Sequence, residues 1–351
     1  MAKVLMKGNE ALGAACISAG CRTFFAYPIT PQSEVPEYLA RELPKVGGKF
    51  LQAESEIAAI NMLYGSGGTG TRVATSSSSP GVALMQEGIT YMAGAEVPAL
   101  IINMMRGGPG LGSIQPSQTD YFQSTRGGGN GDYRTITLAP ASIQEMVDLV
   151  HVGFDLAELY RNPVILCGDG LLGQMMEPVE FKEYTPMELP EKDWAAVGTG
   201  GKRKPNIINS LYLSPETLEA HNKHLIEKFA KIAENEVRVE TVGIEDADLV
   251  FTAFGTVSRI CKSAAEILRD KGYKIGIIRP ITLWPFPFAA FDQINPNCKG
   301  ILDVEMNHGQ MVEDVRLAVE GKIPVHFYGR YGGMVPSTEE LVEEALKILE
   351  G

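Results

Sequence analysis

Four short segments combine side chains that can do chemistry with residues that restrict the backbone. They are Tyr-Pro-Ile-Thr-Pro at 27–31, the acids Glu54 and Glu56, Ser-Pro-Gly at 79–81 and Arg-Gly-Gly-Pro-Gly at 106–110. Two prolines fix the backbone around the Thr30 hydroxyl. Hydroxyl, carboxylate and guanidinium groups are those with which proteins bind anions and move protons.

Each of these segments follows a predicted strand. The first 170 residues alternate short apolar runs with helical patterns, which is typical of a parallel sheet with crossover helices. The predicted strands are 22–26, 50–53, 71–75, 97–103, 134–138 and 164–167. Ligands of open parallel sheets bind beyond the carboxyl ends of the strands. We therefore expect the four segments to lie together at one edge of the sheet.

Each segment also has a purely structural interpretation. The proline-rich segment could be a stiff turn, the two glutamates could complement the positive end of the following helix, and Arg106 could form a surface ion pair. Loops at strand ends face solvent and gain little stability from such restricted sequences. The coincidence of four of them favours a functional site.

The pattern predicts two α/β units, residues 1–240 and 241–351. In the first, a capping box of Ser142 and Glu145 opens a long helix that ends at 162–163. Residues 177–214, rich in proline and charge, are predicted to form a surface excursion, and a helix capped by Ser214 follows, with an apolar stripe of Leu218, Leu225, Phe229 and Ile232.

The second unit repeats the alternation on a smaller scale. Its predicted strands are 249–253, 274–278 and 301–304, with helices between them and near 311–319. The first of these helices is expected to bury Ile260, Ala264, Ile267 and Leu268. A second capping box, Ser337 with Glu340, opens the final helix.

Composition excludes several classes of protein. The 351 residues are 44% hydrophobic and carry a net charge of −12, with no run of four basic residues, so we expect no nucleic-acid partner. The longest apolar stretch, 97–105, is far shorter than the roughly 20 residues that a membrane span requires. The N-terminal residues show no secretory signal pattern, and we expect a cytoplasmic protein with no membrane partner.

No metal or dinucleotide site is predicted within this chain. The five cysteines form no Cys-x-x-Cys pair and the five histidines are dispersed, so neither an iron–sulfur cluster nor a zinc site is expected, and the thiols should be reduced and buried. Residues 65–70 fit Gly-x-Gly-x-x-Gly but precede a strand instead of following one. Gly-Asp-Gly at 168–170 begins like a thiamine diphosphate motif, but no asparagine occurs between 171 and 205, so we interpret it as a structural turn.

These segments resemble the 2-oxoacid:ferredoxin oxidoreductases, and the similarity runs almost end to end. The motifs at 27–31, 52–61, 79–81 and 106–110 are similar to the subunit with the pyrimidine-binding domain of a thiamine diphosphate enzyme. Arg-Pro-Ile-Thr-Leu-Trp-Pro-Phe-Pro at 279–287 resembles the transketolase carboxyl-terminal-like domain that follows it. Residues 115–118 and 173–178 are most similar to the branched-chain, 2-oxoisovalerate branch, with the 2-oxoglutarate branch next.

The resemblance implies a role for each site residue. Glu56, and not Glu54, would be the catalytic acid that hydrogen-bonds the pyrimidine ring, while Thr30 and Arg106 would bind the substrate carboxylate. The residues expected to contact the coenzyme are Tyr27, Pro28, Ile29, Glu56, Ser79, Pro80 and Gly81. Ser-Pro-Gly departs from the Gly-Pro-Gly of many thiamine enzymes.

The resemblance also implies a shared active centre. One partner subunit would hold the diphosphate and Mg²⁺, another would carry ferredoxin-type [4Fe-4S] clusters, and a further small subunit, coenzyme A and external ferredoxin would complete the reaction. The alternatives are a 2-oxoglutarate-specific subunit, the smaller chain of a lipoamide-linked 2-oxoacid decarboxylating component, and a noncatalytic scaffold. Intact Thr30, Glu56 and Arg106 make the scaffold the weakest of these.

Overall fold

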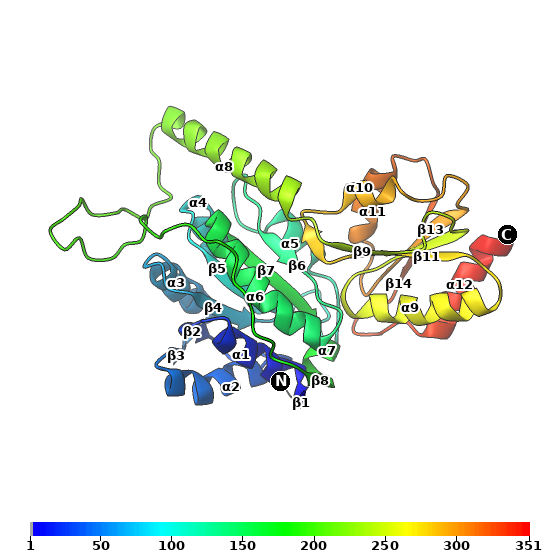
Figure 1. Ribbon diagram of the computed structural model, residues 1–351, viewed down its shortest axis with the longest axis horizontal. Helices are drawn as coiled ribbons and strands as arrows, with labels where there is room; N and C mark the ends of the chain where they lie inside the picture. Colours follow the sequence, from blue (N-terminus) through cyan, green and yellow to red (C-terminus); the bar gives the residue numbers. More distant parts are fainter. Residues whose placement is uncertain (1–2) are drawn as a thin grey trace.

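The computed structural model describes residues 3–351, which form two α/β units side by side (Figure 1). The first unit is built on a seven-stranded sheet of order β12-β6-β7-β5-β4-β2-β3. All neighbouring strands in it are parallel except β12, which runs antiparallel to β6. Its strands are β2 (Thr23–Ala26), β3 (Lys49–Gln52), β4 (Val73–Ser77), β5 (Ala99–Met105), β6 (Ile136–Leu138), β7 (Pro163–Asp169) and β12 (Thr282–Trp284).

Helices connect these strands. They are α1 (Gly8–Ser18), α2 (Glu34–Glu42), the short 3₁₀ helix η1 (Leu43–Val46), α3 (Glu56–Gly67), α4 (Ser79–Gly94), α5 (Tyr121–Arg126), α6 (Ile143–Tyr160) and α7 (Gly170–Gln174). A separate antiparallel pair, β1 (Val4–Lys7) with β8 (Met176–Val179), lies beside the N-terminus of α1.

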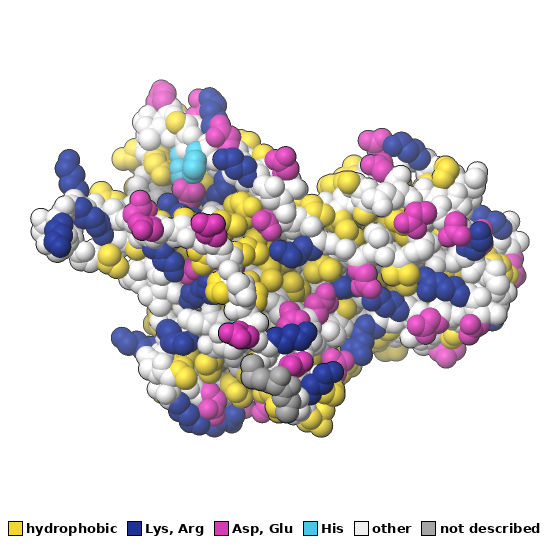
Figure 2. All heavy atoms as spheres, in the orientation of Figure 1, with side chains coloured by type: hydrophobic (Ala, Val, Ile, Leu, Met, Phe, Trp, Pro, Cys, Tyr) yellow, Lys and Arg dark blue, Asp and Glu magenta, His cyan; other side chains and the backbone are white. Residues whose placement is uncertain are grey.

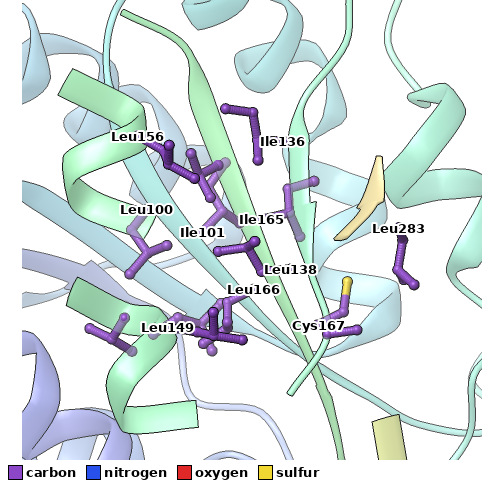
Figure 3. Close-up of a cluster of buried hydrophobic side chains, with 14 of the residues drawn as sticks. Leu100, Ile101, Ile136, Leu138, Leu149, Leu156, Ile165, Leu166, Cys167 and Leu283 are labelled. Atoms are coloured by element: carbon purple, nitrogen blue, oxygen red, sulfur yellow. The ribbon is translucent and has the colours of Figure 1, made fainter. Parts of the chain in front are cut away.

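The core of the first unit lies where β5 and β7 meet α6. Every residue of β5 and β7 is buried, as expected for central strands of a parallel sheet that is covered on both faces. Figure 3 shows apolar side chains of β5, β6 and β7 together with leucines from α6 and β12: Leu100, Ile101, Leu138, Leu149, Leu156, Ile165, Leu166 and Leu283.

The second unit contains a five-stranded sheet of order β14-β13-β10-β11-β9. Its strands are β9 (Val239–Val242), β10 (Leu249–Thr252), β11 (Ile275–Pro280), β13 (Gly300–Glu305) and β14 (Val325–Gly329), and its helices are α9 (Gly255–Asp270), α10 (Phe288–Phe291), α11 (Met311–Val319) and α12 (Thr338–Glu350). The predicted boundary at residue 240 falls inside β9, which pairs with β11. After β11 the chain returns to the first sheet and adds β12 to it, so the second half of the chain contributes one strand to the first sheet.

Several local expectations need correction. Ser142 accepts a hydrogen bond from the Glu145 amide, but the Glu145 carboxylate accepts from the Ala141 amide instead of closing a capping box, because it also binds Arg279. Two residues predicted to be buried, Leu218 and Ile267, are each 40% exposed. Both lie on helices that pack along a narrower face than the apolar pattern indicates. The capping box of Ser337 and Glu340 is present in full.

The predicted surface excursion begins later than expected, because residues 177–179 belong to β8. From 180 to 214 the chain forms no regular helix or strand and then enters α8 (Pro215–Asn235), whose cap is Ser214 as predicted. Figures 1 and 2 show part of this segment projecting from the first unit, with Lys and Arg side chains at the projecting tip. Within residues 3–351, no helix is both long and apolar enough to cross a membrane.

Candidate functional site

The four segments singled out in the sequence lie together at the carboxyl ends of β2, β3, β4 and β5. The Arg106 guanidinium donates from Nη1 to the Thr30 carbonyl at 2.9 Å, and the Arg106 amide donates to Ser79 Oγ at 3.0 Å. Glu56 is the first residue of α3 and contacts the start of α4 at Gly81. The tertiary structure therefore joins Thr30, Arg106, Ser79 and Glu56 into one continuous surface.

Glu56 is a buried acid whose position depends on residue 81 being a glycine, which has no side chain. Only 4% of the residue is exposed, and a Cβ placed on Gly81 would lie 2.5 Å from Glu56 Oε1 and 2.0 Å from Ser77 Oγ. Ser55 caps the same helix, since its hydroxyl accepts from the Ala58 amide at 3.2 Å. Glycine at position 81 is thus required for Glu56 to reach this place. Glu54, by contrast, is exposed and bonded to the Ser55 hydroxyl.

Two unpartnered hydroxyls lie on the segment just before Gly81, the residue that Glu56 contacts. The Oγ atoms of Ser77 and Ser78 are buried and have no hydrogen-bond partner within residues 3–351. Buried polar atoms in folded proteins are almost always paired, so such a group marks a place where a ligand can supply the missing bond. A carboxylate with hydroxyls next to it fits a heterocycle that has both donor and acceptor nitrogens, such as an aminopyrimidine.

Arg106 is 7% exposed and therefore does not form the surface ion pair considered as an alternative. Its Nη1 and Nη2 donate to the carbonyls of Thr30 and Leu111, at 2.9 and 3.1 Å, and its Nε has no partner. Among the described residues, no carboxylate lies within ion-pair distance of this guanidinium. A buried cation without a counter-ion is costly, and an anionic ligand would supply the missing charge.

The proline-rich segment presents its side chains to the outside. Tyr27, Pro28 and Thr30 are exposed and Ile29 is half-buried, so their faces are open to a ligand or to another chain. The Thr30 side chain borders a pocket of about 570 Å³ whose other walls include Glu34, Gln115 and Gln174.

Asp120 is a candidate functional residue that the sequence pattern did not indicate. It is 8% exposed, and its Oδ2 accepts hydrogen bonds from Ser79 Oγ at 2.5 Å and from Asn103 Nδ2 at 2.9 Å. Burial raises the pKa of this carboxyl above its ordinary value. No local pattern indicates it, because its two partners lie on β5 and at the start of α4, and the nearby sequence signal is Gln-Pro-Ser-Gln at 115–118.

The second unit holds the segment around Asp120 in place. The Gln118 amide donates to the Met306 carbonyl, and the Met306 amide donates to Gln118 Oε1, both at 3.0 Å. Gln118 Nε2 donates to the Phe254 carbonyl at 2.8 Å. Asn307 Nδ2 donates to the Gln118 carbonyl at 2.8 Å. Because these bonds are buried, they fix the two units relative to each other beside the site.

The two glycine-rich motifs that resemble cofactor-binding sequences, at 168–170 and 65–70, have structural roles. Asp169 in Gly-Asp-Gly caps α7, since its Oδ1 accepts from the amides of Leu171 and Leu172 at 2.9 and 3.0 Å. Residues 65–70 end α3 and lead into β4, which is not the position of a dinucleotide fingerprint. The glycine loop at 127–131 is bound to α4, with the Gly128 amide donating to Gln86 Oε1 at 2.9 Å.

No metal-binding cluster of His, Cys, Asp or Glu is present in residues 3–351, and the five cysteines are free and buried. The described site consists of two buried acids, Glu56 and Asp120, one buried cation and several hydroxyls at a sheet edge. These groups can orient an organic anion and share a proton with a bound heterocycle.

Comparison with known proteins identifies the class of fold and site. Residues 14–240 match the family model described as pyruvate flavodoxin/ferredoxin oxidoreductase, thiamine diphosphate-binding, and residues 247–341 match pyruvate:ferredoxin oxidoreductase core domain II. The first unit is thus the pyrimidine-binding domain of a thiamine diphosphate enzyme, and the second is the transketolase carboxyl-terminal-like domain. A split-gene transketolase, 14% identical with a TM-score of 0.60, shares this fold.

The chain belongs to the 2-oxoacid:ferredoxin oxidoreductase family and is a subunit of such an oxidoreductase. It is 46% identical to the ketoisovalerate oxidoreductase subunit VorB of Methanothermobacter marburgensis, over 99% of this chain and 98% of that protein. It is 36% identical to the 2-oxoglutarate synthase subunit KorA of Archaeoglobus fulgidus, over 99% and 98% respectively.

A solved structure extends this comparison. The 2-oxoglutarate:ferredoxin oxidoreductase from Magnetococcus marinus, with 2-oxoglutarate, coenzyme A and succinyl-CoA bound, aligns with a TM-score of 0.85 and 30% identity. The alignment covers 99% of this chain but 65% of that one. The subunit names of the relatives indicate an enzyme of several chains.

Proposed function

We propose that this chain supplies the pyrimidine-side half of a shared thiamine diphosphate site. The assembled enzyme would convert a branched-chain 2-oxoacid, 2-oxoisovalerate first, and coenzyme A into acyl-CoA and carbon dioxide, and pass the electrons to ferredoxin. The observation that supports this most is that Arg106 and Glu56 are both buried at the same edge of the sheet, and that no carboxylate of the described residues forms an ion pair with Arg106. The 46% identity to a ketoisovalerate oxidoreductase subunit favours the branched substrate.

The side chains of this subunit would divide the work. Arg106 would bind the substrate carboxylate through the guanidinium fork, and the Thr30 hydroxyl would contact the same end of the molecule. Glu56 would hold the aminopyrimidine through a shared proton, with Ser79, Pro80 and Gly81 beside it and Tyr27, Pro28 and Ile29 on the opposite side. Thiamine diphosphate, when bound, supplies the carbon nucleophile that makes decarboxylation of a 2-oxoacid possible.

The remaining parts would come from other chains. One partner would bind the diphosphate and Mg²⁺, another would carry [4Fe-4S] clusters, and a further small subunit and external ferredoxin would complete electron transfer. Five free, buried thiols are compatible with work in the cytoplasm. The 2-oxoglutarate alternative keeps this scheme and changes the substrate, as in the KorA relatives. Family membership disfavours the lipoamide-linked alternative, and the unsatisfied groups of the site disfavour a scaffold.

The test is a matched pair of variants in the assembled complex, Glu56→Gln and Glu54→Gln. Glu56→Gln should abolish coenzyme A-dependent viologen reduction with 2-oxoisovalerate, because an amide cannot share the proton, while subunit assembly stays intact. Glu54→Gln should keep activity, since Glu54 is exposed and bonded only to the neighbouring Ser55 hydroxyl in the described structure. Full activity of Glu56→Gln would refute the proposed role.

A further inference from the structure

A cavity of about 640 Å³ opens between the two units, next to the candidate site. The first unit lines it with the start of α4 and with the glycine loop 108–110, and the second unit with residues 307–310 and 331–332. The Gln118 bonds to Met306 and Phe254 hold both walls in fixed positions. The shape of the cavity is therefore fixed by hydrogen bonds within the chain.

Its walls are mainly apolar. Pro80, Ala83 and Pro109 form one side, and the rings of His308 and Tyr331, stacked at 5.6 Å, form the other. No residue that lines the cavity in the described chain is Lys or Arg, and the carboxyl group that does line it belongs to Asp120. A second carboxylate on a ligand would meet an acid here and no cation, which is unfavourable.

The cavity adjoins the segment that carries Arg106, although Arg106 and Thr30 are not among its lining residues. Ser79, one of its lining residues, accepts the hydrogen bond from the Arg106 amide, and the loop 108–110 directly follows Arg106. Near the Thr30 end of Arg106 lies the other pocket, which has two carboxylates and two side-chain amides beside its apolar residues: Glu34, Glu37, Gln115 and Gln174 with Pro31, Ile114, Pro116 and Leu171. Of these two pockets, the cavity between the units has the more apolar lining and one carboxyl group instead of two, so it suits a hydrocarbon chain on a 2-oxoacid anchored at Arg106 better.

We infer that this cavity receives the hydrocarbon side chain of the 2-oxoacid and disfavours substrates with a second carboxylate. This inference rests on the proposed function and names the part of the chain that selects the substrate. The volume exceeds what an isopropyl group fills, so larger side chains such as isobutyl and benzyl should also be accepted. Specificity would then depend on the apolar surface of α4 and on the absence of a cation.

The test narrows the cavity in the assembled complex with Ala83→Leu. Ala83 is exposed on α4, so a leucine can extend into the cavity without displacing core residues. The ratio of kcat/KM for 2-oxoisovalerate to that for pyruvate should fall about tenfold, because leucine adds three carbons to the cavity wall and even one methylene in an apolar pocket changes specificity by about this much. Ala220→Leu, at an exposed position of α8 outside the cavity, should leave the ratio unchanged.

Two further variants make the outcome decisive. Ala83→Arg should raise kcat/KM for 2-oxoglutarate relative to 2-oxoisovalerate, because it supplies the missing cation. Ile114→Phe narrows the pocket near Thr30 and should leave the ratio of 2-oxoisovalerate to pyruvate unchanged. The inference would be overturned if Ala83→Leu left the ratio of kcat/KM for 2-oxoisovalerate to that for pyruvate unchanged, or if Ile114→Phe changed this ratio instead. The proposed function would stand in either case. An unaltered complex that oxidises no 2-oxoacid would refute the proposed function itself.

Discussion

Glu56 occupies the space that a side chain at Gly81 would need, with its Oε1 2.5 Å from the position of a Cβ atom there. Glu56 is the first residue of α3, which follows β3, and Gly81 is the third residue of α4, which follows β4. In the sheet, β2 lies between these two strands. The contact of Glu56 with Gly81 sets where the acid stands relative to the unpartnered hydroxyls of Ser77 and Ser78.

Gly81→Ala should therefore displace Glu56 and weaken thiamine diphosphate binding by about tenfold or more, since overpacking a tight site costs roughly 1–3 kcal/mol. The measurement is coenzyme affinity of the assembled complex by titration. Gly65→Ala is the matched control, because no atom lies within 4 Å of a Cβ at that helical position. It should be neutral or stabilising. Equal coenzyme affinity of both variants would contradict the close approach.

Arg106→Lys should raise KM for the 2-oxoacid by about tenfold or more, because lysine keeps the charge but loses the planar fork that binds a carboxylate at two points. The thermal midpoint is measured in parallel, since Arg106 also donates to the carbonyls of Thr30 and Leu111. Arg22→Lys is the control: Arg22 is exposed and donates to the Ile17 and Cys21 carbonyls, outside the site. A changed midpoint with an unchanged KM would assign Arg106 a structural role.

His151 should make the fold sensitive to acid. Burial lowers the pKa of its imidazole below 6.5, although the charges of Asp148 and Asp155 act in the opposite direction. Its Nε2 lies 2.9 Å from Ser18 Oγ and its ring 4.7 Å from that of Tyr184. The unfolded chain therefore binds the proton more readily, and stability should fall as pH decreases through 6.5 toward the lower folded pKa.

Urea unfolding between pH 7 and pH 5 checks this expectation for the chain and for His151→Gln. The glutamine variant should lose less stability over this interval, because it has no group to protonate. Parallel pH profiles for the two proteins would exclude His151 as a source of the acid sensitivity.

The cysteines should be unreactive in the native protein. All five are buried, and burial raises the pKa of the Cys21 and Cys167 thiols to about 12. Because the thiolate is the reactive form, a disulfide reagent at pH 8 should label none of them until the chain is unfolded in guanidinium, when all five react. Rapid labelling of Cys298, which is 7% exposed, would show that the second unit opens.

The sequence by itself determined the elements and the kinds of groups at the sheet edge. Alternating apolar runs predicted the strands from β2 to β7 within a few residues, and Ser214 and Ser337 marked the starts of α8 and α12 because capping is a local interaction. Since the carboxyl ends of parallel strands share one edge, the motifs containing Thr30, Glu56 and Arg106 could be placed together before any coordinates.

Only the tertiary structure decided which of these groups are buried, which are paired, and what lies beside them. Asp120 enters the site through hydrogen bonds to Ser79 and Asn103, residues 41 and 17 positions away, and no local pattern reports such contacts. The strand β12 joins the first sheet from within the second unit, and the cavity depends on both units at once. These features arise from long-range packing, whose free energy depends on neighbours in space and leaves no periodic signal in the chain.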